Sequence, residues 1–319
     1  MPCAHARNAV PRRLPVTRTR LPVACRGDRK KQKLDEPEPF DASVCASRLI
    51  DAWCTGGMIT ERGPHFTPPD IASVYGVHEA MRAHPAMGVL GGVVGYKMGG
   101  TGAAKLPSGT PTPALPGIII GPPLGIDPAF GVVPEGVVLP KARCGYSNVE
   151  AEVGFRMKAT PAPSSTCFPL TDEDVWAAVG EVFLAIECCG TRYALKTGED
   201  APSPLEKSAD SQCAGAVVYG KSWCVGDDCP SPVVLASLRA AISVNGVEVH
   251  QGGADSCPLG SPLKSLAWLA NHLPSRGQCL RAGDTIITGA IAKTKAFAPG
   301  DQIVASFGDL GSVALQFKP

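Results

Sequence analysis

The segment Asn148-Val149-Glu150-Ala151-Glu152-Val153-Gly154-Phe155 alternates apolar residues with two glutamates. This period of two predicts a β-strand that packs its apolar side chains on one face and carries Glu150 and Glu152 on the other. Two carboxylates about 7 Å apart on one strand face repel each other unless a proton or a cation lies between them. The pair therefore indicates a divalent-metal site on a sheet. The alternative is an exposed strand face with two solvated acids.

A third glutamate, Glu187, lies in the apolar run Val182-Phe183-Leu184-Ala185-Ile186-Glu187-Cys188-Cys189. A carboxylate in such company needs a partner, because burying an unpaired charge is costly. Three carboxylates without a histidine suit a hard ion such as Mg²⁺ or Mn²⁺ better than zinc. We expect Glu150, Glu152 and Glu187 to be the metal ligands, with coordination positions left for a chelating substrate.

The composition limits the classes of partner. With 319 residues and 44% hydrophobic content the chain can bury a sizeable core. No apolar run approaches the roughly 20 residues that a membrane-spanning helix needs, so no membrane partner is expected. Residues 1–34 carry ten Lys or Arg and one acid, which leaves twenty bases against twenty-eight acids from residue 35 onward. This acidic body argues against nucleic acid as a partner.

The first 34 residues are rich in arginine and proline, a composition that predicts a transit-peptide-like leader. Val23-Ala24-Cys25-Arg26 is similar to plastid processing sites, so we predict a plastid location, with the mitochondrion as the alternative. A disordered basic tail is the other interpretation. The thirteen cysteines are scattered and lack paired CxxC motifs, which predicts reduced thiols. We interpret Cys188 and Cys189 as structural filling.

Helical signals gather early in the chain and strand signals gather late. The predicted helices cover 42–53, a stretch from Pro68 capped by Thr67, a stretch from Thr171 carrying Val175 to Val182, and 263–273. The predicted strands include a hairpin over 241–249 with an Asn245-Gly246 turn, and 284–288, 302–307 and 312–317. This order predicts an α+β protein, with a helical region over 35–92 and a β-rich catalytic region over 93–319 built as a roll or barrel-like sheet.

Short motifs in a fixed order carry a family resemblance over roughly residues 41 to 319. They are Gly95-Tyr96-Lys97-Met98-Gly99, Val149-Glu150-Ala151-Glu152, Ile186-Glu187, Pro262-Leu263 with Ala267-Trp268-Leu269-Ala270-Asn271, Ala282-Gly283-Asp284-Thr285-Ile286-Ile287-Thr288-Gly289, Pro299-Gly300-Asp301, Phe307-Gly308 and Leu310-Gly311-Ser312-Val313. Together they resemble the 2-keto-4-pentenoate hydratase and 4-oxalocrotonate decarboxylase group of the fumarylacetoacetate hydrolase superfamily.

The resemblance implies a β-rich roll of the fumarylacetoacetate hydrolase type with peripheral helices, Mg²⁺ or Mn²⁺ held by the same three glutamates, and assembly into a homo-oligomer. It also implies a catalytic role for Lys97, although a surface lysine on a strand is the alternative. Thr288 is expected to contact substrate, or else to be an ordinary threonine at a strand end. The implied reaction is metal-dependent addition of water to a 2-hydroxy-2,4-dienoate, which gives a 4-hydroxy-2-oxo acid.

Two other interpretations stay open. One is a 2-oxo acid decarboxylase or an acylpyruvate-type C–C hydrolase on the same scaffold, although no histidine and acid pair stands out for hydrolysis. The other is a non-catalytic assembly subunit. The chain departs from the family pattern at Asp210-Ser211-Gln212-Cys213-Ala214-Gly215, at Gly190-Thr191 and at Ala290, where substrate recognition and proton transfer are expected.

Overall fold

The computed structural model describes residues 39–99, 115–121, 131–139, 145–163, 168–194, 201–226 and 228–319. Residues 37–319 form one compact unit. The predicted leader over 1–34 lies outside the described residues. The predicted boundaries between this leader, the helical region over 35–92 and the β-rich region over 93–319 stay predictions. Within the described chain, no helix combines the length and apolar character that crossing a bilayer requires.

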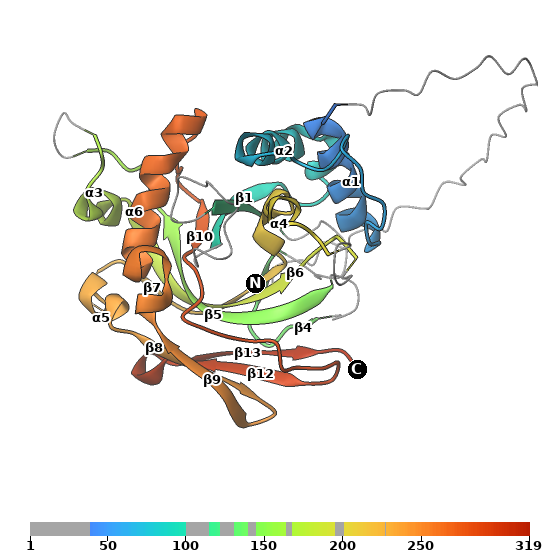
Figure 1. Cartoon of the computed structure of the whole chain (residues 1–319). Coiled ribbons are helices and arrows are strands. Elements are labelled where there is room, and N and C mark those ends of the chain that lie inside the picture. The colour runs from blue at the N-terminus through green and yellow to red at the C-terminus, as the bar shows by residue number, and fades with distance from the viewer. Residues whose placement is uncertain are drawn as a thin grey trace, which may run out of the picture. The chain divides into compact units, whose positions relative to one another are not determined.

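A large mixed sheet forms the centre of this unit (Figure 1). Its strands run in the order β2-β1-β10-β5-β6-β7-β3, and β11 pairs with β5 as well. The bounds are β1 Val93–Gly99, β2 Leu115–Ile120, β3 Gly131–Pro134, β5 Tyr146–Met157, β6 Val179–Gly190, β7 Ala216–Cys224, β10 Thr285–Ile287 and β11 Ala292–Thr294. The strands β5 and β6 are twelve residues each and pair antiparallel.

A second sheet lies against one face of the first. Its order is β4-β13-β12-β8-β9, with bounds β4 Val138–Leu139, β8 Arg239–Val244, β9 Val247–Gly253, β12 Gln302–Ser306 and β13 Ser312–Phe317. The two sheets approach closely at Gly220 of β7, where there is no room for a larger side chain. A Cβ added at Gly220 would come within 2.3 Å of Val313 of β13. The β-rich prediction is confirmed, although the strands form two mixed sheets and neither closes into a barrel.

Six α-helices of the described chain flank the sheets (Figure 1). They are α1 Ala42–Thr55, α2 Ile71–Ala83, α3 Asp172–Ala177, α4 Pro204–Ala209, α5 Pro232–Ala236 and α6 Pro262–His272. Short 3₁₀ turns occur at η1 Pro85–Met87, η4 Ser211–Cys213, η5 Ala254–Ser256, η6 Pro258–Gly260, η7 Leu273–Arg276 and η8 Gly308–Leu310. The helix α1 packs with α2, α2 with α4, and α6 with α3 and α5.

Two helix predictions need correction. The N-cap of α2 is Asp70, whose side chain accepts from the Ser73 amide at 2.7 Å, and not Thr67. Thr67 and Pro68 each precede a proline, which disfavours the helical backbone at both positions. The capping box at Thr171 is present, but α3 ends at Ala177. The residues from Val179 onward join β6 instead, where they gain hydrogen-bonded partners on both sides.

The two faces of β6 pack against different apolar clusters. Val182, Leu184 and Ile186 belong to the main core between the sheets. Phe183 and Ala185, on the other face, belong to a smaller cluster that is completed by Ile119, Val217 and Ile287. Because side chains alternate along a strand, Glu187 shares the face of Phe183 and Ala185. The smaller cluster therefore lies beside the predicted metal ligands.

His78 anchors α2 to α4, in keeping with its prediction as a packed helix residue. Its ring is buried, and its Nε2 bonds to the Ser208 carbonyl oxygen at 2.9 Å. Burial lowers the pKa of His78 to about 3, and the positive charge of nearby Arg276 acts in the same direction. The imidazole is therefore neutral in the folded protein at pH values where it is charged in the unfolded chain.

This shift predicts an acid-dependent loss of stability. Between pH 6.5 and about 3 the unfolded chain binds a proton at His78 that the folded chain does not bind, so stability falls as the pH decreases. The free energy of unfolding should drop by about 2 kcal/mol from pH 7 to pH 5 through this residue. Urea unfolding of the wild type and of His78→Gln across this range measures it. Parallel stability curves for the two proteins would contradict the prediction.

Candidate metal centre

The antiparallel pairing of β5 with β6 sets the positions of the predicted ligands. Glu150 lies directly across from Glu187 in the register, and Asn148 lies across from Cys189. Glu152 is two residues further along β5 and shares the face of Glu150. The strands thus bring all three predicted glutamates to one face of the large sheet. Their roles as metal ligands stay a prediction.

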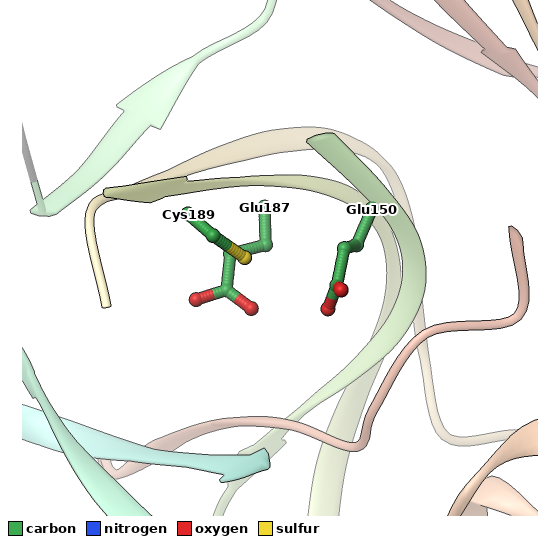
Figure 2. Close-up of side chains that lie close together, drawn as sticks. All are labelled: Glu150, Glu187 and Cys189. Atoms are coloured by element: carbon green, nitrogen blue, oxygen red, sulfur yellow. The ribbon is translucent and has the colours of Figure 1, made fainter. Parts of the chain in front are cut away.

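A tight group of possible metal ligands lies where the paired strands β5 and β6 place Glu150 across from Glu187. One ligand atom from each of Glu150, Glu187 and Cys189 lies within 4.8 Å of the other two. Figure 2 shows these side chains leaving neighbouring strands on the same face, with the Cys189 thiol beside the Glu187 carboxylate. Glu187 and Cys189 are buried, and Glu150 is half-buried.

The sequence interpretation missed Cys189 by treating it as structural filling together with Cys188. Cys188 does belong to the apolar core between the sheets. Cys189 lies on the opposite face, where its Sγ is 3.9 Å from Lys97 Nζ and 3.9 Å from Asn148 Nδ2. The signal was present in the sequence, because residues two apart on a strand share a face and Cys189 follows Glu187 by two.

Lys97 extends from β1 into the same site. Its side chain is buried, which excludes the alternative of a surface lysine. Its Nζ lies 2.5 Å from Glu187 Oε1 and donates to the Gln212 carbonyl oxygen at 3.1 Å. Burial works against the charged amine, but the surrounding acidic groups, led by Cys189 and Glu187, raise the pKa of Lys97. Lys97 is therefore held as an ammonium ion.

Glu152 is fully buried beside this group. Its Oε2 accepts a hydrogen bond from the Gly289 amide at 2.8 Å, and its Oε1 has no partner in the described chain. Burial raises the pKa of Glu152 well above its usual value, and the charges of Glu187 and Glu150 add to this shift. Burial also raises the pKa of Glu187, while Lys97 opposes the shift. The single positive charge of Lys97 does not balance the negative charges of these carboxylates.

Thr288 lies next to Gly289 at the edge of the site. Its side chain is fully buried, and its Oγ1 donates to the Val153 carbonyl oxygen at 2.9 Å. This bond fixes the end of β10 on β5 and so positions the Gly289 amide that holds Glu152. The predicted contact between Thr288 and substrate stays a prediction.

A buried ion pair stabilises the turn at residues 211–213, which contacts Lys97. Arg192 Nε lies 2.6 Å from Asp210 Oδ1, and the Arg192 amide donates to Asp210 Oδ2 at 2.7 Å. The guanidinium also donates to the Ala214 carbonyl oxygen at 2.6 Å. Between these anchors, Ser211, Gln212 and Cys213 have φ angles of 52°, 57° and 61°. Left-handed backbone is unfavourable for such residues, so the flanking contacts hold the turn in place.

The turn approaches β2 as closely as a glycine permits. A Cβ added at Gly117 would come within 2.2 Å of the Ser211 carbonyl oxygen. This contact places the Gln212 carbonyl oxygen where Lys97 Nζ reaches it. The departures from the family pattern at residues 211–214 therefore lie against the candidate site.

A family model for the fumarylacetoacetate (FAA) hydrolase C-terminal region matches residues 124–318. A 4-oxalocrotonate decarboxylase of Pseudomonas putida is 34% identical over 227 residues, covering 70% of this chain and 77% of the relative. A 2-keto-4-pentenoate hydratase of Paraburkholderia xenovorans is 26% identical over 290 residues, covering 88% and 96%. Among solved structures, 4-oxalocrotonate decarboxylase from Pseudomonas putida G7 complexed with magnesium and adipate superposes with a TM-score of 0.70 at 28% identity, covering 86% of this chain and 97% of that one.

These comparisons contradict the predicted plastid or mitochondrial location. The relatives come from Pseudomonas putida and Paraburkholderia xenovorans, which are bacteria. The prediction used the basic, proline-containing composition of residues 1–34, and such a composition is shared by basic segments of several kinds. The prediction of an organelle is therefore withdrawn.

Removing the charge of Asp210 should destabilise the protein strongly. Asp210→Asn leaves the Arg192 guanidinium buried without its counter-ion, which costs about 3 to 5 kcal/mol. Glu61→Gln is the matched control, because the Arg48–Glu61 pair spans 3.5 Å at the surface and Glu61 is 77% exposed. That change should cost less than about 1 kcal/mol. Chemical unfolding measures both values, and similar losses would contradict the assignment of the buried pair.

Proposed function

The chain belongs to the fumarylacetoacetate hydrolase family, and on this premise we propose that it is a divalent-metal-dependent lyase that adds water to a 2-hydroxy-2,4-dienoate. The product is a 4-hydroxy-2-oxo acid. The observation that carries this proposal is the group of three glutamates on β5 and β6, of which Glu152 and Glu187 are fully buried, with Lys97 Nζ 2.5 Å from Glu187. A relative over most of this chain is a 2-keto-4-pentenoate hydratase.

The residues present fit a hard divalent ion. Glu152 Oε1 and Glu187 Oε2 are buried oxygens that accept no hydrogen bond in the described chain, and such orphaned oxygens are costly unless a cation meets them. We propose that Glu150, Glu187 and Glu152 hold Mg²⁺ or Mn²⁺, which prefer oxygen ligands. When bound, the ion supplies positive charge that polarises an oxygen of the substrate.

Lys97 is proposed to bind and orient the substrate carboxylate. Its ammonium group is buried, fixed by Glu187 and the Gln212 carbonyl oxygen, and stays charged because the nearby acids raise its pKa. A fixed positive charge in a site shielded from water attracts a carboxylate more strongly than it would in solvent. The raised pKa favours this positioning role over that of a general base.

We also propose that apolar side chains beside the glutamates limit the access of water to the reacting carbons. Phe183, Ala185 and Ile287 form an apolar floor on the face that carries the glutamates. Asn148 Nδ2 donates to Glu150 Oε1 at 2.6 Å and fixes the half-buried glutamate in position. A substrate bound against this floor would be held in one orientation, so that a water molecule would reach a single carbon of the diene.

A second candidate is decarboxylation of a 2-oxo dicarboxylic acid. It is favoured by the 34% identity to a 4-oxalocrotonate decarboxylase and by the superposition on another. Both reactions begin from a 2-oxo or 2-hydroxy acid and need the same anchor for its carboxylate. They differ in whether water is gained or CO₂ is lost.

We also propose that the protein assembles as a homo-oligomer.

The experiment that tests the function follows the ultraviolet absorbance of 2-hydroxypenta-2,4-dienoate after stripped protein is resupplied with Mg²⁺ or Mn²⁺, with products identified by mass. A gain of water supports the hydratase. Loss of CO₂ from an oxalocrotonate substrate, without hydration of the dienoate, supports the decarboxylase. Metal binding without turnover of either substrate would contradict both proposals.

Glu187→Gln should lower both metal affinity and turnover by at least about 10-fold to 100-fold, because one charged ligand is lost. Glu181→Gln is the matched control on the same strand, since Glu181 pairs with Arg156 and lies six residues from Glu187 along β6. It should change neither value. Isothermal titration with Mn²⁺ and steady-state kinetics measure both variants, and wild-type metal affinity in Glu187→Gln would contradict the ligand assignment.

Lys97→Met should raise the KM for the dienoate by at least about 10-fold, since the variant loses a charge-assisted contact with the substrate carboxylate. Mn²⁺ affinity should stay the same or increase, because removing the ammonium frees Glu187. Lys221→Met, a change on the exposed part of β7, serves as the control for loss of a positive charge. An unchanged KM in Lys97→Met would refute the positioning role.

A further inference from the structure

Cys189 has the surroundings of a ligand rather than of a packing residue. Its Sγ lies within 4.8 Å of a carboxylate oxygen of Glu150 and of Glu187. Two nitrogen donors, Lys97 Nζ and Asn148 Nδ2, are each 3.9 Å from it. A cysteine that only fills space is expected among apolar side chains, as Cys188 is in the main core. The thiol of Cys189 instead faces charged and polar groups.

The geometry points to Cys189 as a further ligand of the same ion, which gives this centre an affinity for thiophilic cations such as Co²⁺, Zn²⁺ and Cd²⁺. This inference rests on the proposed metal centre and specifies its cation selectivity. A thiolate is a soft ligand, whereas carboxylates prefer hard ions, so one sulfur added to the proposed carboxylate ligands widens the range of metals that bind. A sulfur ligand would bind the ion as the thiolate, so binding through Cys189 would release one proton per ion.

The position of Cys189 on the strand supports this assignment. Glu187 and Cys189 are both on β6 and point to one face, so an ion that contacts the Glu187 carboxylate is within reach of the sulfur without a change in the backbone. Figure 2 shows the thiol directed toward the space between the two carboxylates. The site needs no rearrangement of the sheet to use all three groups.

A second buried thiol near the site provides a contrast. Cys257 lies close to Glu152, but its Sγ contacts the Gly289 carbonyl oxygen at 3.3 Å. In the described chain it is not part of the tight group of candidate ligands. Replacing Cys257 therefore tests whether any thiol near the site can bind the ion or whether only Cys189 can.

Cobalt spectroscopy on the full chain tests the inference. Protein stripped with a chelator is titrated with Co²⁺, and sulfur ligation is read from a thiolate-to-metal absorption band in the near ultraviolet. We expect the band in the wild type, in Cys188→Val and in Cys257→Ala, and its loss in Cys189→Val. The Cd²⁺ affinity of Cys189→Val should fall by at least about 10-fold. Its Mn²⁺ affinity should change by less than about threefold, because the carboxylates remain.

The outcomes separate this inference from the proposed function. Wild-type protein that binds Mn²⁺ and Co²⁺ without the band, or a Cys189→Val variant that keeps its Cd²⁺ affinity, would overturn thiol ligation and leave the metal centre intact. Loss of the band in Cys257→Ala but not in Cys189→Val would also overturn it. Protein that binds none of these ions would refute the metal centre and this inference together. Cys189→Ser, which keeps a small polar side chain, checks that any loss is not caused by misfolding.

Discussion

The pairing of β5 with β6 places carboxylates opposite each other inside the protein, and the rest of the site compensates for this constraint. Glu150 faces Glu187 across the two strands, and Glu152 and Glu187 are fully buried. Buried carboxylates that lie close together raise one another's pKa and favour the neutral forms. Lys97 offsets part of this cost through its 2.5 Å contact with Glu187. A divalent cation would offset the rest, so the close approach of these buried carboxylates favours ion binding.

The position of Lys97 depends on long-range contacts. The strand β1 reaches β5 through β10, because Lys97 pairs with Ile287, and Ile287 in turn pairs with Gly154. On its other side Lys97 contacts the left-handed turn at Gln212, which the Arg192–Asp210 pair holds in place. A defect in any of these contacts would move the ammonium group away from Glu187. The position of the predicted catalytic lysine thus depends on the turn beside the buried ion pair as well as on its own strand.

Some of the site could be predicted from the sequence because it depends on local periodicity. Alternation along β5 was enough to place Glu150 and Glu152 on one face, and the apolar run around Glu187 indicated a buried acid. Lys97 was found through the family resemblance, since a single lysine in a strand carries no period of its own. The pairing of Arg192 with Asp210 could not be predicted, because it joins residues eighteen apart in the chain. The turn that follows Asp210 could not be predicted either, because Ser211, Gln212 and Cys213 adopt left-handed backbone angles that their residue types disfavour. The helix predicted after Thr171 was too long for a similar reason, because long-range contacts decided the structure. Pairing of β6 with strands on both sides outweighed the local helical pattern.

The proposed metal ligands and the groups around Lys97 lie on different parts of the chain. The candidate ligands lie on two long central strands, where a shift of one residue would turn every side chain to the other face and expose the core. The groups near Lys97 lie on the turn at 211–213, which can change in sequence while Arg192 and Asp210 keep its backbone in place. One stretch that departs from the family pattern, residues 211–214, lies in this second part. A substitution in the turn can therefore change the surroundings of Lys97 without changing the proposed ligands on β5 and β6. Cys189 lies on β6 with Glu187, so the proposed thiol ligation changes the ligand set itself. Its effect should therefore appear in the choice of metal before it appears in the choice of substrate.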